Sequence, residues 1–311
     1  MKPLKPRALK PGARIALISP ASSFDVERWH AGEAALRRFG YEPVPMANSM
    51  KSAPQYFAGT VEERLDDLHT AFADRSIDAL LCNRGGYGSN MLLPGLDLDL
   101  IRANPKPFIG YSDATSLMTW MQRETGLVTF HGPLLAGDFS RDDGVDEESW
   151  KNSLAKTALW QLGPESGLTT MRAGSARGRL IGGCLPMLAA SLGTPYEIDT
   201  RDSILFLEDV NTRPYQVDRM LMQLRFAGKF ENVRGVVFNM MMDCVSPGAP
   251  PTLIWDVIRR LFEDFDGPVV YGLRSGHVRS PNITVPLGIE VEVDARQAPT
   301  LHFLESAVEE R

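Results

Sequence analysis

The stretch PFIGYSDATSLMTW, residues 107–120, places a serine where a short apolar run changes into a segment with helical spacing. A hydroxyl at the start of a helix lies beside unpaired backbone N–H groups and the positive end of the helix dipole, which stabilise developing negative charge. Ser112 is therefore a candidate nucleophile. The motif also fits a simple helix cap formed by Ser112 or Asp113, and it lacks the second glycine of the GxSxG elbow.

A nucleophilic serine needs a general base, and histidine is the usual one. The chain has five histidines, of which three have patterns typical of surface helices or of a late strand: His30, His69 and His302. His131 in TFHGP and His277 in SGHVRSPN each follow an apolar run and adjoin a glycine. Both are candidates, because their spacing does not rank one above the other.

The base in turn needs a carboxylate that orients the imidazole and stabilises its charged form. The run ILFLEDV ends in two acids, and strand alternation puts Glu208 on one face and Asp209 on the other. An acid at the end of an apolar strand is costly unless it is paired, which makes either residue a candidate. The alternative is that one of them caps the helix that begins near Pro214.

The loop RGGYGS, residues 84–89, offers backbone N–H groups for an oxyanion hole. It lacks the GK[ST] of a Walker sequence and the spacing of GxGxxG, which argues against nucleotide binding. Adjacent glycines allow a close backbone approach to a ligand. We expect the N–H groups of Gly86 and Asp113 to form the hole, and Gly85 and Tyr87 to contact substrate. A plain turn would have the same composition.

The elements that must position these residues follow from apolar periodicity. Short apolar runs alternate with amphipathic helices in the first part of the chain, which predicts a Rossmann-like or flavodoxin-like parallel sheet covered by helices. Helices are indicated at 26–39 and 61–72, and Thr60 with Glu63 forms a capping box before the second. The glycine loop and Ser112 each follow a strand, at the carboxyl end where open α/β sheets carry their sites.

A change in composition divides the chain. The segment GDFSRDDGVDEES, residues 137–149, is polar and acidic without an apolar period, which is typical of a surface linker or lid. Beyond it, shorter and more numerous strands mix with helices. We expect an N-terminal α/β domain over residues 1–140, a linker over 141–170 and a C-terminal mixed α+β domain over 171–311.

Composition excludes several functions. With 311 residues, 43% of them hydrophobic, the chain can form a large core, and its net charge of −6 argues against a nucleic-acid partner. Three widely spaced cysteines indicate neither a disulfide framework nor a zinc site, and the absence of HExxH adds to the expectation of no metal or cofactor. The N-terminal apolar run is too short for a signal peptide or membrane span, so we expect a cytoplasmic protein.

Six segments resemble, in chain order, the motif series of the LD-carboxypeptidases, a serine peptidase family that includes the microcin C immunity proteins. They are NRGGYGS, PKPFIGYSDAT, VTFHGP, GGCLPMLAASLGTP, ILFLEDVNTRPYQVDRMLMQL and SGHVRSPNITVPLG. The resemblance implies a triad of Ser112 as nucleophile, Glu208 as orienting carboxylate and His277 as base and acid. It favours His277 over His131, and it implies an oxyanion hole at the double glycine and Asp113.

The resemblance also implies a barrel-like C-terminal domain that carries Glu208 and His277, a homodimer, and a reaction without metal. The implied substrate is a small peptide, the murein tetrapeptide, from which terminal D-alanine is released in the cytoplasm during peptidoglycan recycling. Three positions depart from the family pattern: Cys184, Thr212 and Gln216 stand where asparagine, glutamate and arginine are usual. For Cys184 we expect a small packing residue.

Three alternatives are weighed against this function. Within the same family, the substrate is a peptidyl or aminoacyl nucleotide of the microcin C type. In a different class, the chain is a non-enzymatic two-domain protein that binds a small molecule with its RGGYG and GYSD loops. A standard α/β-hydrolase esterase has the same order of serine, acid and histidine, but the missing GxSxG disfavours it.

Overall fold

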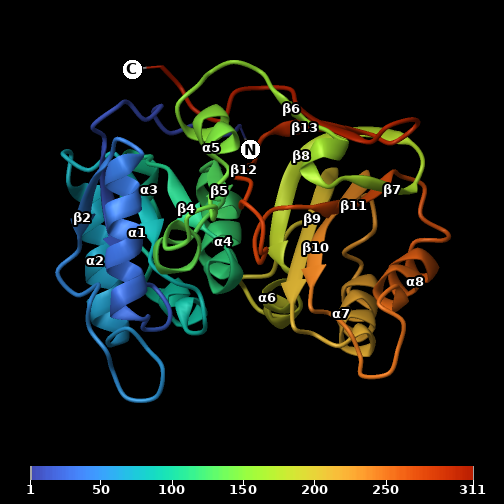
Figure 1. Cartoon of the computed structure of the whole chain (residues 1–311), viewed down its shortest axis with the longest axis horizontal. Coiled ribbons are helices and arrows are strands. Elements are labelled where there is room, and N and C mark those ends of the chain that lie inside the picture. Colours follow the sequence, from blue (N-terminus) through green and yellow to red (C-terminus); the bar gives the residue numbers. More distant parts are fainter. Residues whose placement is uncertain (1, 311) are drawn as a thin grey trace. The chain divides into compact units, whose positions relative to one another are not determined.

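The computed structural model describes residues 2–310, which form two compact units (Figure 1). The first unit comprises the residues up to Ala158, the segment Arg279–Gly288 and the residues from Ser306 onward. The second comprises Leu159–Val278 and Ile289–Glu305. The chain therefore enters the second unit twice and returns twice to the first. The domain limits expected from composition stay a prediction.

The first unit is built on a six-stranded sheet with the order β12-β5-β4-β3-β1-β2. Strands β1 to β5 pair in parallel, and β12 pairs with β5 in the antiparallel direction. The parallel strands thus follow the order 2-1-3-4-5 of flavodoxin-like sheets, which confirms the predicted class. The strands are β1 (Arg14–Ile18), β2 (Glu42–Pro45), β3 (Ala79–Cys82), β4 (Phe108–Gly110), β5 (Thr129–His131) and β12 (Val285–Leu287).

Helices connect these strands, and local capping explains where two of them begin. The predicted capping box starts α2, because Thr60 accepts the N–H of Glu63 and the Glu63 carboxylate accepts the N–H of Thr60. Asp25 caps α1 by accepting the N–H of Arg28 at 2.9 Å. The helices are α1 (Val26–Arg38), α2 (Val61–Ala73), η1 (Ser89–Gly95), α3 (Leu98–Ala103), η2 (Ser112–Ala114), α4 (Thr115–Thr125), η3 (Leu135–Phe139) and α5 (Glu147–Leu154).

The segment 137–149 is not the surface linker or lid that its polar composition predicts. It belongs to the first unit, and Asp138 and Phe139 within it are buried. The Phe139 ring packs at 5.2 Å against Trp150 of α5, and the Asp138 carboxylate accepts the N–H of Leu134 at 2.9 Å. One aromatic anchor and one satisfied carboxylate fix the segment, although it has no apolar period.

The second unit contains an eight-stranded sheet with the order β6-β14-β13-β8-β9-β10-β11-β7. Strands β8 to β11 pair in parallel, whereas the flanking strands pair in the antiparallel direction, so the expected mixed α+β class is confirmed. The strands are β6 (Gln161–Leu162), β7 (Thr169–Arg172), β8 (Ser175–Cys184), β9 (Ser203–Val210), β10 (Gly235–Met242), β11 (Val269–Leu273), β13 (Glu290–Asp294) and β14 (Thr300–Phe303).

The core of the second unit lies between its parallel strands and three helices. Figure 1 shows α7 and α8 side by side below the yellow and orange strands. Buried apolar side chains from β8 to β11 meet those of α6, α7 and α8, among them Leu205, Val236, Leu221 and Ile258. The helices of this unit are η4 (Pro164–Ser166), α6 (Leu185–Ser191), α7 (Pro214–Phe226) and α8 (Leu253–Leu261).

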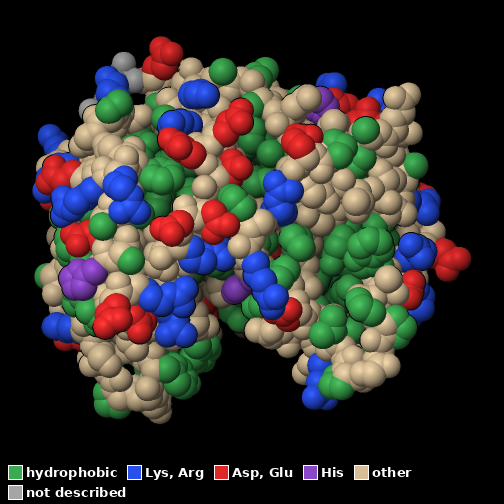
Figure 2. All heavy atoms as spheres, in the orientation of Figure 1, with side chains coloured by type: hydrophobic (Ala, Val, Ile, Leu, Met, Phe, Trp, Pro, Cys, Tyr) green, Lys and Arg blue, Asp and Glu red, His purple; other side chains and the backbone are tan. Residues whose placement is uncertain are grey.

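The surface carries both signs of charge. Figure 2 shows Lys and Arg side chains interspersed with Asp and Glu side chains on the face in view, rather than gathered into one basic field. Within residues 2–310, no helix combines the length and apolar character needed to cross a bilayer.

Candidate active site

Ser112 lies in a sharp turn between β4 and α4, and its backbone is left-handed. Its φ is +63°, while Tyr111 before it is extended with φ −155° and ψ −169°. A side chain in the left-handed region costs about 1–3 kcal/mol, and such strain concentrates at functional sites. Gly110 makes the turn possible, because a Cβ there would lie 2.9 Å from Sγ of Cys82. The geometry is that of a nucleophile elbow without its second glycine.

The glycine loop after β3 lies directly against this serine. A Cβ on Gly85 would come within 2.8 Å of Cβ and 2.9 Å of Oγ of Ser112, and within 3.5 Å of the Asp113 nitrogen. Gly86 has a φ of +111°, and a Cβ there would lie 2.4 Å from Oγ of Ser22. Only glycine fits at both positions. The loop backbone, rather than a side chain from it, therefore lies beside the Ser112 hydroxyl. The N–H groups of Gly86 and Asp113 stay the predicted oxyanion donors.

Ser22, which follows β1, hydrogen-bonds to the glycine loop at two positions. Its Oγ accepts the N–H of Tyr87 at 3.1 Å, and its own N–H donates to the carbonyl of Gly85 at 3.3 Å. The Tyr87 side chain is exposed, with its ring centroid 5.8 Å from that of Tyr56. An exposed aromatic ring on the loop is compatible with the predicted substrate contact, which stays a prediction.

Arg64 of α2 holds the far end of the same loop. It is buried, and its Nη1 donates to the carbonyls of Pro20 at 2.8 Å and Gly88 at 2.9 Å. Burial lowers the pKa of the guanidinium, and the charge of Asp113 opposes that shift. Arg64 is not among the site residues expected from the sequence. Arg64 lies three residues after Val61 and four before Leu68, on the apolar face of α2. This spacing indicates that its side chain is buried.

Asp113 joins the nucleophile turn to the loop. Its buried carboxylate accepts the N–H of Ser89 at 2.7 Å, and the Ser89 hydroxyl donates to the Asp113 carbonyl at 2.5 Å. The side chain therefore does not cap α4 as the simple alternative proposes. It fixes the backbone on the carboxyl side of Ser112 to the residue that ends the glycine loop.

In the second unit, Glu208 and His277 form a close pair. Nδ1 of His277 lies 2.7 Å from Oε2 of Glu208, and the backbone N–H of His277 donates to the same oxygen at 3.4 Å. The Glu208 side chain at the end of β9 is fully buried, whereas that of His277 is 22% exposed. A neutral imidazole that donates from Nδ1 accepts at Nε2, which is the arrangement of a general base.

The competing candidates have different environments. His131 is fully buried in β5 of the first unit, with its ring 5.7 Å from that of Tyr111. Asp209 is also buried, and desolvation raises its pKa to about 6. The Asp209 carboxylate accepts the N–H of Val210, while the carboxylate paired with His277 is that of Glu208.

The predicted site residues thus form two groups. Gly85, Ser112 and Asp113 lie together in the first unit, and Glu208 and His277 lie together in the second. The first group offers a serine hydroxyl on a strained backbone, near the predicted oxyanion donors. The second offers an imidazole that a buried carboxylate orients. Among the described residues, no cluster of His, Cys, Asp and Glu has the arrangement of a metal site.

Comparisons with known proteins follow the same division. The LD-carboxypeptidase N-terminal domain matches residues 15–132, and the LD-carboxypeptidase C-terminal domain matches residues 177–293. A Bacillus subtilis (strain 168) protein named "Probable murein peptide carboxypeptidase" is 38% identical over 299 residues, which cover 94% of this chain and 92% of the relative.

Two further proteins are similar to this chain over most of its length. The murein tetrapeptide carboxypeptidase of Pseudomonas aeruginosa is 34% identical over 278 residues, 85% of this chain and 88% of that protein. The solved structure of MccF in complex with glutamyl sulfamoyl guanosine has a TM-score of 0.91 and 26% identity. It covers 99% of this chain and 100% of its own.

Proposed function

This chain belongs to the LD-carboxypeptidase family, and we propose that it cuts the amide between an L-centre and a terminal D-amino acid through a serine acyl-enzyme. The proposal assigns Ser112 as nucleophile, His277 as base and acid, and Glu208 as orienting carboxylate. The observation that carries it is the 2.7 Å contact between Nδ1 of His277 and Oε2 of Glu208. A buried carboxylate in this position holds the tautomer that a general base needs.

The reaction proceeds in two halves. Oγ of Ser112 attacks the carbonyl carbon of the L-residue while Nε2 of His277 takes the hydroxyl proton. The same imidazolium then gives this proton to the nitrogen of the departing D-amino acid, and the C–N bond breaks to leave an ester on the serine. Water attacks the ester with His277 again as base, and the serine regains its proton as the shortened peptide leaves.

The oxyanion of each tetrahedral intermediate is assigned to the N–H groups of Gly86 and Asp113. The closeness of Gly85 to the Ser112 side chain supports this assignment, because it brings the loop backbone beside the reacting atom. Left-handed backbone at Ser112 supports it as well, since the turn points successive N–H groups toward one side. Loss of one such donor typically costs about 10²–10³ in kcat.

For the substrate we propose the murein tetrapeptide, with release of D-alanine in peptidoglycan recycling. The names of the Bacillus and Pseudomonas relatives support a murein peptide. We place the reaction in the cytoplasm of the cell, where reducing conditions suit three cysteines that form no disulfide in the described chain. A homodimer is proposed as the working form, which light scattering of the purified protein would check.

One observation favours a second substrate, an aminoacyl or peptidyl nucleotide. The chain has a TM-score of 0.91 to MccF, whose solved complex holds glutamyl sulfamoyl guanosine. The same triad would cut an amide of that ligand class by the same two steps. The two substrates differ in their leaving groups, so product analysis separates them.

The proposal is tested by mass spectrometry of the products after incubation with murein tetrapeptide. We expect loss of one alanine by the wild-type protein and by His131→Ala, and none by Ser112→Ala or His277→Ala. A fluorophosphonate should label Ser112 stoichiometrically, which a purely ligand-binding protein would not allow. Activity that disappears with His131→Ala and survives His277→Ala would make the triad assignment wrong. Cleavage of a nucleotide amide alone would replace the proposed substrate.

A further inference from the structure

Cys184 faces the carboxylate of Glu208 from the neighbouring strand. Strands β8 and β9 pair in parallel, and their register puts Cys184 directly beside Glu208. Partner residues in adjacent strands project to the same face of a sheet, a few ångströms apart. Both side chains are buried, at 5% and 0% exposure, and the thiol hydrogen-bonds to the carboxylate.

The sequence GGCLP explains how the thiol reaches this position. Gly182 and Gly183 have φ values of +134° and +146°. A Cβ on Gly182 would lie 2.0 Å from the carbonyl oxygen of Phe206, so the two strands can approach only at a glycine. Helix α6 starts immediately after Cys184 with Pro186 in its first turn. The cysteine is therefore fixed between the end of a strand and the start of a helix.

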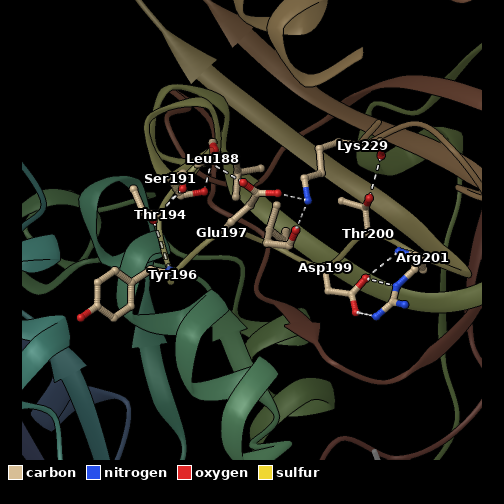
Figure 3. Close-up of polar contacts among 11 residues, drawn as sticks. Leu188, Ser191, Thr194, Tyr196, Glu197, Asp199, Thr200, Arg201 and Lys229 are labelled. Carbon is tan, nitrogen blue, oxygen red and sulfur yellow. Dashed lines mark hydrogen bonds and ion pairs between the residues drawn. The ribbon is translucent and has the colours of Figure 1, made fainter. Parts of the chain in front are cut away.

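The connection from α6 to β9 is also anchored, as Figure 3 shows for residues 188–201. Nζ of Lys229 pairs with the Glu197 carboxylate and donates to the carbonyl of Ile198 at 2.9 Å. The Thr200 hydroxyl donates in turn to the carbonyl of Lys229 at 2.7 Å. These contacts hold the polypeptide that joins the helix after Cys184 to the strand that ends in Glu208.

The direction of the hydrogen bond follows from protonation. Burial raises the pKa of the Cys184 thiol well above its usual value, and the charges of Glu208 and Asp209 raise it further. The sulfur therefore keeps its proton at neutral pH, and an ionised carboxylate accepts hydrogen bonds only. Cys184 is the donor and Glu208 is the acceptor.

We propose that Cys184 is a positioning residue that holds the Glu208 carboxylate in the orientation that accepts Nδ1–H of His277. This inference rests on the proposed function and deepens it, because the thiol acts through Glu208 and touches no reacting atom. The proposal adds a directional role to the packing role expected for Cys184 from its size. A buried carboxylate with a second donor is held in one rotamer, which keeps the imidazole aligned between turnovers.

The test compares Cys184→Ala, which removes the donor, with Cys184→Ser, which restores one. Cys244→Ala is the matched control, because Cys244 is a second buried cysteine of the same unit and its thiol bonds to the backbone of Thr212 instead. With murein tetrapeptide as the substrate, we expect Cys184→Ala to lower kcat about tenfold at unchanged KM. The acidic limb of its kcat/KM profile should move to lower pH, because a misaligned carboxylate stabilises the imidazolium less. Cys184→Ser and Cys244→Ala should remain within about threefold of wild type.

A readout that needs no substrate separates this inference from the proposed function. The Nδ1 proton of His277, held by a buried carboxylate, should give a low-field proton NMR resonance. We expect Cys184→Ala to shift it, and Cys184→Ser and Cys244→Ala to leave it near its wild-type position. If Cys184→Ala does not fold, Cys184→Val fills the space without a donor and takes its place.

Each result has one meaning. A shifted resonance in a protein that does not cleave the tetrapeptide would reject the proposed substrate and support the positioning role. An unchanged resonance, with unchanged kcat and pH profile, in the folded Ala or Val variant would overturn the positioning role. A loss in Cys184→Ser as large as that in Cys184→Ala would also overturn it, because volume rather than a donor would then matter.

Discussion

Gly85 lies so close to Ser112 that a methyl group on the glycine would stand 2.8 Å from the serine Cβ. This approach joins two loops that follow neighbouring parallel strands, β3 and β4. Parallel strands end at the same edge of a sheet, so the loops meet there, and a missing side chain lets them touch. The result is a serine with a strained backbone, whose side chain lies close to the main chain of the glycine loop.

Replacement of Gly85 by alanine should lower kcat by about 10² or more, because the new methyl group displaces the loop from Ser112. The first measurement is the rate of D-alanine release from the tetrapeptide. Gly12→Ala is the control: a Cβ there meets nothing within 4 Å, although its φ of +80° costs some stability. Equal rates for the two variants would contradict the close contact.

The left-handed backbone at Ser112 predicts that two inactive variants differ in stability. Ser112→Ala keeps a Cβ at a φ of +63°, whereas Ser112→Gly removes it and relieves the strain. We expect both to lose activity, and the glycine variant to unfold with a free energy about 1 kcal/mol above that of the alanine variant. Urea titration of both proteins measures the difference. A glycine variant that is the less stable of the two would show that the turn is not strained.

The two acids at the end of β9 should differ sharply in function. Glu208→Gln keeps the shape but removes the charge that stabilises imidazolium, and loss of such a carboxylate costs about 10⁴ in kcat. Asp209→Asn is the matched control, one residue along the same strand and equally buried. We expect it to change kcat less than about tenfold, which single-substrate kinetics at pH 7 will measure. Equal losses would mean that the imidazole is not oriented by Glu208 alone.

Much of the fold could be predicted because its signals are local. The Thr60 and Glu63 capping box, the strand before Ser112 and the strand that carries Glu208 depend on neighbouring residues, and the structure has each of these elements where the sequence indicates it. A polar residue that directly ends a buried strand is easily recognised as a site candidate. Ranking His277 above His131 required a family resemblance, since the two have the same local pattern.

Other features could not be predicted because they depend on distant backbone. The side chain of Arg64 is buried and donates hydrogen bonds to the carbonyls of Pro20 and Gly88. Nothing in the sequence of α2 reveals those two acceptors. The segment around Asp138 is acidic, yet one backbone N–H and a neighbouring arginine satisfy its carboxylate. Polar composition alone does not distinguish an exposed loop from a buried network.

Arg64→Met should lower both the stability of the first unit and the kcat of the enzyme. Two buried carbonyls lose donors from a charged group, which we expect to cost about 3 kcal/mol in the free energy of unfolding. The carbonyl of Gly88 is then released, so kcat should fall as the glycine loop loosens. Arg75→Met, at an exposed position after the same helix, should change neither quantity measurably. Unfolding free energies that match between the two variants would contradict the role of the guanidinium.

The stability of the protein should depend on pH through Asp138. Burial raises the pKa of its carboxyl from the ordinary 3.8 to about 6, so the folded chain binds this proton more tightly than the unfolded chain. The stability from the protonated acid is complete below about pH 4 and is lost as the pH rises through about 6. The shift of about two units corresponds to about 3 kcal/mol.

Asp138→Asn stays neutral at every pH, so its free energy of unfolding relative to wild type should rise by about that amount between pH 4 and pH 7. Urea titrations of both proteins at the two pH values measure this change. Asp142→Asn removes an acid from an exposed position in the same segment and should keep a constant difference from wild type. A difference that is constant for Asp138→Asn as well would mean that the carboxylate is ionised in the folded protein throughout, with its pairing to Arg141 outweighing its burial.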